Sequence, residues 1–352
     1  MSLSASCFGI PTNDLDHILN SVGNKWENLK GATILLTGGT GFIGKWILDS
    51  FLYANKNCNL NAKIIVISRN PEKFSRVYPA IAGYSEIEWF AGDIIELPKG
   101  NFPVCKFAIH AATDVVIKNS PDVILKTSLL GTQNVLDAIS NEKEHCRLLY
   151  ISSGAVYGDI PASVEKISEE WAGAPSLFTS KSAYGEGKRI GELLCQAAVE
   201  EREGLEVSIA RCFAFVGPHL PLDKQFAIGN FIRSALLNET IQINGDGSPL
   251  RSYLYIADLI HWLWVMLFEG ENCRPYNVGG DEIISIKDLA YKVNEVLNCS
   301  LDVELGQSTK PNASSNRYVP SLNRIKEELN LSPSFDLDTS ITRTAKWAKT
   351  II

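Results

Sequence analysis

A short apolar segment that runs straight into three glycines is the feature that most narrows the possible folds of this chain. Residues 33–44 read TILLTGGTGFIG. Gly38 can supply a tight turn with positive φ, Gly41 lets the backbone approach a pyrophosphate, and Gly44 lets a following helix lie close to the strand. Free amides at the start of that helix favour a bound phosphate. The preceding apolar strand and the following amphipathic helix predict a dinucleotide-binding unit rather than a bare glycine-rich turn.

Composition limits the class of protein. The chain has 352 residues, 45% of them hydrophobic, which is enough for one large or two modest domains. A formal charge of −7 without a long basic run argues against nucleic acid as a partner. Eight cysteines are spread singly, so we predict no metal site, no disulfide framework and a reduced, cytoplasmic setting. No signal peptide is visible, and Asp258 and His261 interrupt the longest apolar stretch, so no membrane span is expected.

Alternating apolar segments predict an α/β fold. A short amphipathic helix is expected after residues 12–14, ahead of the glycine motif. The expected strands are 33–37, 63–68, 87–90, 107–110, 148–152, 211–216 and 276–278. The expected later helices are 128–139, 286–297 and 321–329, with a buried helix in the stretch 254–268.

The residues that end the second strand bear on the choice of cofactor. An acid at this position would accept hydrogen bonds from the adenosine ribose and repel a 2′-phosphate. This chain instead has Ser68 and Arg69, and an arginine can bind that phosphate with a charge-assisted fork. The sequence therefore favours NADP(H) over NAD(H), although a solvated arginine before Pro71 would look the same.

Two later strand ends also face the expected cofactor. Asp93 is placed to hydrogen-bond an adenine amino group, although an ordinary turn would have the same sequence. His110 ends the fourth expected strand, and the small residues Ala111 and Ala112 after it leave room for the middle of the cofactor. His110 itself fits a packed, hydrogen-bonded histidine as well as a functional one.

Three residues carry the predicted chemistry. Ser153 follows an apolar strand, and Tyr184 and Lys188 stand four residues apart, on one face of a helix. A nearby ammonium favours the phenolate form of a tyrosine, which makes Tyr184 a usable acid or base. Ser153 could hydrogen-bond the same substrate oxygen. A Tyr-x-x-x-Lys spacing alone is common, but after a glycine-rich unit and a serine-ended strand it indicates catalysis.

The motifs of this chain, taken in order, resemble those of the extended short-chain dehydrogenase/reductases, in the branch that modifies nucleotide sugars. The resemblance covers nearly the whole chain after residue 30. It rests on TGGTGFIG (37–44), GDI (92–94), HAA (110–112), SSGAVYG (152–158), YGEGK (184–188), RCFAFVGP (211–218), GDGSPLRSYLYIADL (245–259) and YNVGG (276–280).

The resemblance implies a role for particular residues. Catalysis falls to Ser153, Tyr184 and Lys188. Cofactor contacts are expected from Gly38, Gly41, Phe42, Ile43, Gly44, Ser68, Arg69, Asp93, Ile94, His110, Ala111, Ala112, Ser128, Tyr184 and Lys188. Contacts to a nucleotide-sugar substrate are expected from Ser153, Gly154, Ala214, Asn230, Arg251 and Arg317.

The expected fold is a Rossmann-type doubly wound parallel sheet with a smaller C-terminal α/β substrate-binding domain. Residues 1–30 would form a helical extension. Residues 31–215 would form the NAD(P)-binding domain, to which 250–280 return, and 216–249 with 281–352 would form the substrate domain. By resemblance, the helices around 128–139 and 184–199 could pair in a homodimer.

Departures from the family pattern narrow the reaction. Gly154 and Ala155 follow the serine where dehydratases and decarboxylases of this branch usually carry acids, which disfavours a 4,6-dehydratase. Ala214 and Ser128 stand where asparagines are common. We therefore favour reduction of a 4-keto-6-deoxy sugar nucleotide by NADPH, with Tyr184 as the proton donor. A 4-epimerase with tightly held NAD is the alternative, and a dinucleotide-sensing protein without catalysis is a third reading.

Overall fold

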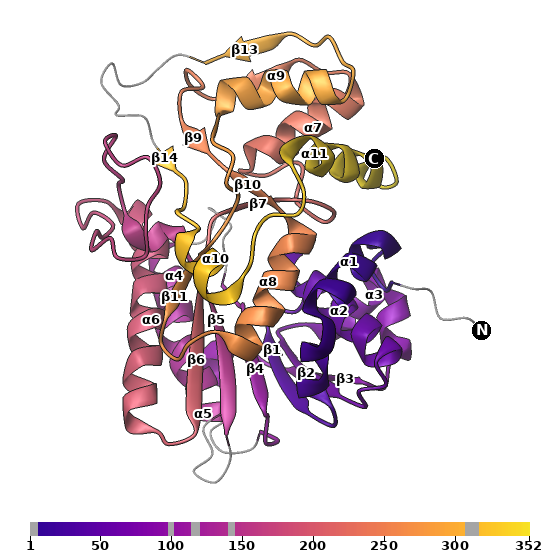
Figure 1. Ribbon diagram of the computed structural model, residues 1–352, viewed down its shortest axis with the longest axis vertical. Helices are drawn as coiled ribbons and strands as arrows, with labels where there is room; N and C mark the ends of the chain where they lie inside the picture. The colour runs from indigo at the N-terminus through magenta and orange to yellow at the C-terminus, as the bar shows by residue number, and fades with distance from the viewer. Residues whose placement is uncertain (1–5, 98–101, 114–119, 140–144, 307–316) are drawn as a thin grey trace. The chain divides into compact units, whose positions relative to one another are not determined.

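The main sheet has the strand order of a doubly wound fold. In the computed structural model, which describes residues 6–97, 102–113, 120–139, 145–306 and 317–352, the order is β11-β6-β5-β4-β1-β2-β3 (Figure 1). The strands are β1 (Thr33–Thr37), β2 (Lys63–Ser68), β3 (Ile87–Ala91), β4 (Phe107–His110), β5 (Cys146–Ser153), β6 (Leu205–Cys212) and β11 (Pro275–Val278). Pairing is parallel from β3 through β2, β1 and β4 to β5. The predicted Rossmann-type sheet is confirmed. Its order reverses between β1 and β4, where ligands of such sheets bind at the carboxyl ends of the strands.

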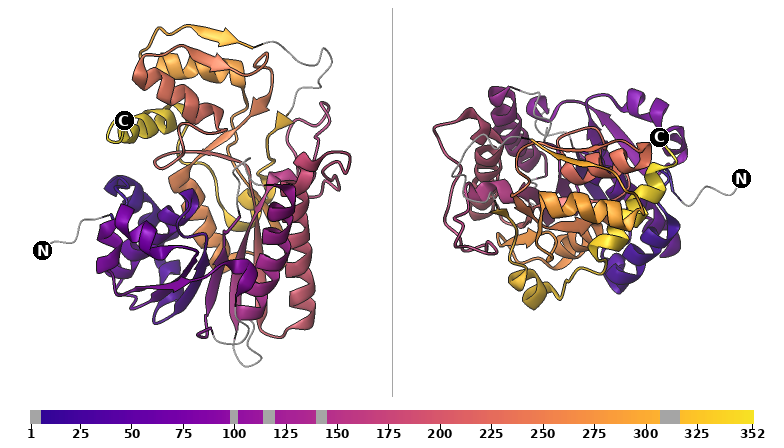
Figure 2. Two further views of the ribbon diagram at one scale, coloured as in Figure 1. Left: turned by 180° about the vertical axis from the view of Figure 1, so that it is seen from behind. Right: turned by 90° about the horizontal axis from the view of Figure 1, so that it is seen from above.

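Helices cover both faces of this sheet (Figure 2). They are α1 (Thr12–Val22), α2 (Phe42–Asn57), α3 (Pro71–Val77), α4 (Pro121–Lys126), α5 (Thr132–Ile139), α6 (Ala183–Glu201) and α8 (Ile256–Glu269). Leu35, Ala108 and Leu148 share one buried cluster with side chains of α5 and α6. Because side chains alternate along a strand, Phe107 points to the opposite face, where its ring centroid lies 5.6 Å from that of Phe268 in α8.

The chain divides into two compact units, which we describe separately. Unit 1 consists of Met1–Gly158, Ala174–Arg211 and Ile260–Tyr276. Unit 2 consists of Asp159–Gly173, Cys212–Leu259 and Asn277–Ile352. Compactness does not show which part binds a substrate, so the domain roles assigned from the sequence stay a prediction.

Unit 2 combines short strands with three longer helices. Its strands are β7 (Ala214–Val216), β8 (Ile241–Ile243), β9 (Leu250–Arg251), β10 (Tyr253–Tyr255), β12 (Ile284–Ser285), β13 (Val303–Leu305) and β14 (Arg317–Tyr318). Helices α7 (Ala227–Leu237), α9 (Ile286–Val296) and α11 (Leu337–Ala348) pack on one another, and α10 spans Asn323–Leu329. Asn277 is fully buried, and its Nδ2 donates to the carbonyls of Ile167 at 2.9 Å and Ser321 at 3.2 Å. This one side chain therefore ties two of the three segments of unit 2 together, Asp159–Gly173 and Asn277–Ile352.

The structure differs from the expected elements at three places. The strand expected at 211–216 is divided, because β6 ends at Cys212 and β7 begins at Ala214 and pairs with β10. The helix expected at 128–139 starts as a π-helical turn, η4 (Thr127–Gly131), which joins α4 to α5. The stretch 254–268 contains the end of β10 as well as α8. Among the described residues, no helix has both the length and the apolar character needed to cross a bilayer.

Candidate active site

The glycine loop lies at the point where the strand order reverses. Gly38 directly follows β1 and has φ +75°, as its role in a tight turn requires. A Cβ on Gly38 would lie 2.7 Å from the carbonyl carbon of Ala111, so the loop and the end of β4 are in close contact. A Cβ on Gly44 would lie 2.2 Å from the Gly38 carbonyl oxygen, so α2 starts close against the loop. The loop thus forms a cradle that a side chain would fill and that a dinucleotide pyrophosphate fits.

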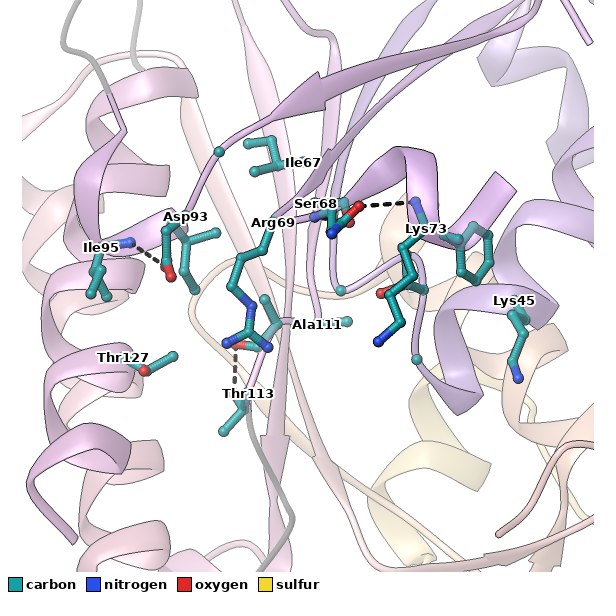
Figure 3. Close-up of a pocket in the computed structure, with 18 of the residues that line it drawn as sticks. Lys45, Ile67, Ser68, Arg69, Lys73, Asp93, Ile95, Ala111, Thr113 and Thr127 are labelled. Atoms are coloured by element: carbon teal, nitrogen blue, oxygen red, sulfur yellow. Dashed lines mark hydrogen bonds between the residues drawn. The ribbon is translucent and has the colours of Figure 1, made fainter. Parts of the chain in front are cut away.

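A cavity in unit 1 opens beside this loop, at the carboxyl ends of β1 to β4 (Figure 3). Eight of the predicted cofactor residues line it: Gly38, Gly41, Ser68, Arg69, Asp93, Ile94, Ala111 and Ala112. Phe42, Ile43, Gly44, His110, Ser128, Tyr184 and Lys188 were expected to contact the cofactor and are not among the lining residues. The sequence reasoning missed Thr40, Lys45, Ile67, Asn70, Lys73, Phe74, Val77, Tyr78, Gly92, Ile95, Thr113, Val123 and Thr127.

The charge of the cavity wall is mainly positive. Lys45, Arg69 and Lys73 all line it, and Figure 3 shows Arg69 extending into the cavity from the end of β2. Among the described lining residues Asp93 is the only acid, and its Oδ1 accepts a hydrogen bond from the Ile95 amide at 3.1 Å. The wall can therefore accept an anion at the end of β2 and still offers one carboxylate oxygen at the end of β3.

Lysine and aromatic side chains form the wall beside α3. Asn70 caps this helix, since its Oδ1 accepts a hydrogen bond from the Lys73 amide at 2.9 Å. The Lys45 ammonium donates to the Tyr78 hydroxyl at 3.2 Å and lies 5.2 Å from the centroid of that ring. Both lysines come from helices that begin just after a strand end, and a charged residue at such a position is the signal that could have revealed them.

His110 is a packed residue that supports the strand ends. It is 2% exposed, its Nδ1 lies 2.7 Å from the Thr37 hydroxyl, and its Nε2 lies 3.2 Å from the Thr132 hydroxyl. Burial, and then the charge of Lys188, lower the pKa of His110 to about 3. The imidazole is therefore neutral near pH 7, and of the two roles left open by the sequence its surroundings favour the packed, hydrogen-bonded one.

Lys188 is held rigidly near the cavity. It lies in α6 and is 3% exposed. Its ammonium donates to the Thr113 hydroxyl at 2.7 Å and to the Ile151 carbonyl at 2.6 Å, and it lies 5.2 Å from the centroid of the Tyr150 ring. Thr113 also lines the cavity, so this threonine connects the lysine to the space in which a cofactor would bind.

Ser153 and Tyr184 come from neighbouring elements. Ser153 is the last residue of β5, and its hydroxyl accepts a hydrogen bond from the Ala155 amide at 3.2 Å. Tyr184 is half-buried near the start of α6, four residues before Lys188 and hence on the same face of the helix. Helix α6 packs on both β5 and the turn η5 (Gly154–Tyr157) that follows Ser153. The backbone therefore brings all three predicted catalytic residues into one part of unit 1.

Close packing of α6 depends on small residues along one side. A Cβ on Gly187 would lie 2.5 Å from the Ser128 hydroxyl oxygen, and one on Gly191 would lie 1.9 Å from the Tyr150 hydroxyl oxygen. Ser128 is 2% exposed, and its hydroxyl has no hydrogen-bond partner among the described residues. Ser128 packs between η4 and α6, and the cofactor contact predicted for it stays a prediction.

A largely buried ionic network joins the catalytic segments. Arg211, in β6, donates to Glu192 of α6 at 2.7 Å and to the Tyr157 hydroxyl at 3.0 Å. Glu192 also accepts a hydrogen bond from Ser152, the residue before Ser153. One ion pair thus ties the end of β5, the turn η5 and α6 to one another.

The predicted substrate residues lie in unit 2, apart from Ser153 and Gly154. Arg251 and Arg317 come from the neighbouring strands β9 and β14, in which Arg251 pairs with Tyr318 and Leu250 pairs with Arg317. Paired residues share a face of a sheet, so the two arginine side chains start on opposite faces. The Arg251 guanidinium lies 5.7 Å from the centroid of the Tyr318 ring, whereas Arg317 donates to the Glu165 carbonyl at 3.3 Å.

The remaining two predicted substrate residues are also in unit 2. Ala214 begins β7 and pairs with Tyr253 of β10. Asn230 lies in α7, where its Nδ2 donates to the Lys224 carbonyl at 2.9 Å. Burial lowers the pKa of Arg251, but a guanidinium stays charged at neutral pH, so Arg251 remains able to bind an anion.

Comparison with known proteins identifies the class that this fold and site define. The chain belongs to the NAD dependent epimerase/dehydratase family, whose model matches residues 34–279. The resemblance noted from the motifs, and the prediction of an NAD(P)-dependent enzyme class, are confirmed at the level of this family.

The individual relatives reported below share less than a third of their residues with this chain. UDP-glucuronic acid decarboxylase 3 of Arabidopsis thaliana is 27% identical over 304 residues, covering 86% of this chain and 85% of the relative. UDP-glucuronic acid decarboxylase 1 of the same plant is 29% identical over 318 residues, covering 89% of this chain and 69% of the relative. The crystal structure of UDP-glucuronic acid 4-epimerase from Bacillus cereus, in complex with UDP-glucuronic acid and NAD, matches the fold with a TM-score of 0.74 at 22% identity, covering 91% of this chain and 100% of that chain.

Proposed function

We propose that the protein reduces a keto group on a nucleotide-linked 4-keto-6-deoxy sugar and that it uses NADPH. The observation that carries the choice of cofactor is the basic end of β2, where Ser68 and Arg69 line the cavity together with Lys73. A 2′-phosphate would find a guanidinium and an ammonium there, whereas a protein selective for NAD(H) would place a carboxylate at this position. A reductase must exchange its cofactor in every turnover, which suits a cofactor that is drawn from solution rather than held permanently.

The loop after Ser153 supports reduction over dehydration or decarboxylation. Gly154 and Ala155 offer no carboxylate, and Gly154 is buried at the start of η5. Removal of water from C5 and C6 needs a further acid and base beside the sugar, and the resemblance implies that decarboxylases of this branch usually carry an acid at this place too. Reduction needs only one proton donor, and Tyr184 can fill that role.

The bound dinucleotide would supply a hydride to C4 of the sugar. Tyr184 would donate its phenolic proton to the oxygen at that carbon, and the proton would later be replaced from solvent. The Lys188 ammonium stabilises the phenolate that is left, and the bonds from Lys188 to Thr113 and Ile151 fix its position. Ser153 would hydrogen-bond the same substrate oxygen and orient the carbonyl.

Several parts of the proposal concern the substrate and the assembly. We assign the phosphates of the nucleotide sugar to Arg251 and Arg317, and further contacts to Gly154, Ala214 and Asn230. A homodimer through α6 and the 128–139 region is expected, and light scattering in solution would test it. A cytoplasmic location stays a prediction from the sequence.

Cofactor identity is the sharpest test of the proposal. The protein is purified and denatured, and any released dinucleotide is identified. Emptied wild-type protein, Arg69→Ala and Arg76→Ala are then titrated with NADPH and NADH by fluorescence. Arg76 is a matched control, because it lies on α3 yet does not line the cavity. We expect the wild type to prefer NADPH, Arg69→Ala to lose most of that preference, and Arg76→Ala to keep it.

Turnover separates the possible reactions. The loaded enzyme is mixed with 4-keto-6-deoxy sugars linked to UDP, dTDP, GDP and CDP, and NADPH oxidation is followed by absorbance. Tyr184→Phe should bind NADPH normally but lose turnover by a factor of about 100 or more. Co-purified NAD⁺ that does not exchange would overturn the reductase assignment and point to a 4-epimerase. Unchanged behaviour of Tyr184→Phe would instead support a sensor without catalysis.

A further inference from the structure

The first described residues, Ser6–Ile10, form a segment that we call the N-terminal strap. Asp49 of α2 is 2% exposed and holds it. Its carboxylate accepts hydrogen bonds from the Ser6 hydroxyl at 2.5 Å, from the following amide at 2.8 Å and from the Phe8 amide at 3.3 Å. The Ser6 hydroxyl in turn accepts from the Ile10 amide at 2.7 Å. These bonds fix the backbone of the strap on α2.

The strap brings one aromatic ring against aromatic side chains in α3 and at its C-terminal end. Phe8 is 5% exposed, and its ring centroid lies 5.8 Å from that of Phe74 and 5.1 Å from that of Tyr78. The Phe74 ring also lies 5.0 Å from Tyr78 and 5.5 Å from Trp89 in β3. Such tilted and perpendicular contacts are favourable between aromatic rings. Phe8 thus completes a cluster of four rings that holds α3 against the rest of unit 1.

Helix α3 depends on this cluster for its position. It has seven residues, none of them fully buried, and a helix of this length is not stable without tertiary contacts. Lys73, Phe74 and Tyr78 nevertheless line the cavity at the end of β2. Phe8 itself does not line the cavity. The strap can therefore influence a ligand only through the elements that it contacts, which are α3 and, through Asp49, α2.

We propose that the N-terminal strap is a positioning element for the cofactor site, which holds α3 and thereby sets the affinity for the adenosine half of the dinucleotide. The strap precedes the family match, which begins at residue 34, so it is an addition to the part of the chain that defines the family. The inference rests on the assignment of this cavity to the dinucleotide under the proposed function, and it does not depend on which sugar is reduced.

The test compares Phe8→Ala with three other variants. Phe8→Leu keeps most of the volume and serves if the alanine variant does not fold. Phe335→Ala is the matched control, because Phe335 belongs to an aromatic contact in unit 2, with its ring centroid 4.9 Å from that of Tyr255. Arg69→Ala reports on the cavity itself. Each protein is titrated with NADPH by fluorescence well below its melting temperature, and kcat and KM for NADPH are measured with the keto sugar nucleotide that the turnover assay selects.

We expect the Kd for NADPH to rise about fivefold or more in Phe8→Ala, the effect of losing ring contacts that hold the wall, and to rise less in Phe8→Leu. KM for NADPH should rise with Kd, whereas kcat at saturating NADPH should stay unchanged.

Wild-type affinity in folded Phe8→Ala or Phe8→Leu, with weakened binding in Arg69→Ala, would refute the role of the strap alone. An equal loss in Phe335→Ala would also refute it, since the effect would then be general destabilisation. Unchanged binding in both Arg69→Ala and Phe8→Ala would overturn the assignment of the cavity and this inference with it.

Discussion

The ion pair between Arg211 and Glu192 allows a quantitative test of how the catalytic segments are held. The two side chains are 15% and 13% exposed, so both charges are largely removed from water. Loss of one partner from a buried pair costs about 3–5 kcal/mol, because the other charge is left uncompensated. We expect Arg211→Met and Glu192→Gln each to lower the free energy of unfolding by about 3 kcal/mol, at the low end because some solvent reaches the pair.

The double variant makes the reasoning falsifiable. Arg211→Met with Glu192→Gln leaves no buried charge behind, so its cost should fall short of the sum of the single costs by about 2 kcal/mol. Urea unfolding, followed by tryptophan fluorescence, measures all four corners of this cycle. The single variants should also lower kcat, because Ser152 precedes Ser153 and bonds to Glu192. Additive costs within about 0.5 kcal/mol would refute a coupled pair.

Three further outcomes are expected. Gly191→Ala should lower kcat and stability together, because its Cβ would lie 1.9 Å from the Tyr150 hydroxyl oxygen. The control is Gly83→Ala, at an exposed position where a Cβ has open space. Melting curves and turnover rates of the two variants measure the difference. The pKa of His110 is lowered to about 3, so acid should destabilise the fold. Between pH 3 and the unfolded pKa of about 6.5, the unfolded chain binds one proton more than the folded chain at this residue. The free energy of unfolding should therefore fall by about 1.4 kcal/mol for each unit by which the pH is lowered in this range. Urea midpoints of the wild type and of His110→Gln across pH 4–7 test this, and equal slopes would contradict it. Asn277→Ala should cost about 2 kcal/mol, because the buried Ile167 carbonyl and the partly buried Ser321 carbonyl lose their donor. Urea unfolding measures this cost, and a negligible change would contradict the reasoning.

Local signals were enough to predict the sheet and the glycine loop. The sequence TILLTGGTGFIG specifies a strand, a turn that needs positive φ at Gly38 and a helix start, all within a dozen residues. The break between β6 and β7 could not be predicted, because residues 212–216 are uniformly apolar after Arg211, and only the pairing of Ala214 with Tyr253 moves the second half to another sheet. Propensity reports that a segment is a strand, but not which sheet it joins.

Contacts between residues far apart in the sequence could not be predicted from the sequence alone. Thr113 follows an expected strand end, yet its bond to Lys188 joins positions 75 residues apart. The hydrogen bonds between Asp49 and the N-terminal strap also join residues far apart in the chain, and no periodic sequence pattern predicts them. Arg251 and Arg317 were both predicted as phosphate ligands, but that they stand on adjacent strands with opposite side-chain directions follows only from the register.

The close packing of α6 on its neighbours offers protein engineering a way to adjust how far the Lys188 ammonium extends towards its acceptors. Gly187 and Gly191 leave almost no space between this helix and its neighbours, and Lys188 is carried on the same helix to acceptors at 2.6 and 2.7 Å. A lysine side chain has a fixed length, so it reaches both acceptors at only one distance between α6 and its neighbours. Moving α6 outward by the size of a methyl group therefore has the same effect as shortening the lysine. A lysine analogue with one extra methylene should partly restore what a bulkier residue at position 191 removes. Helix spacing and side-chain length are thus interchangeable variables at this site, and one can be tuned against the other.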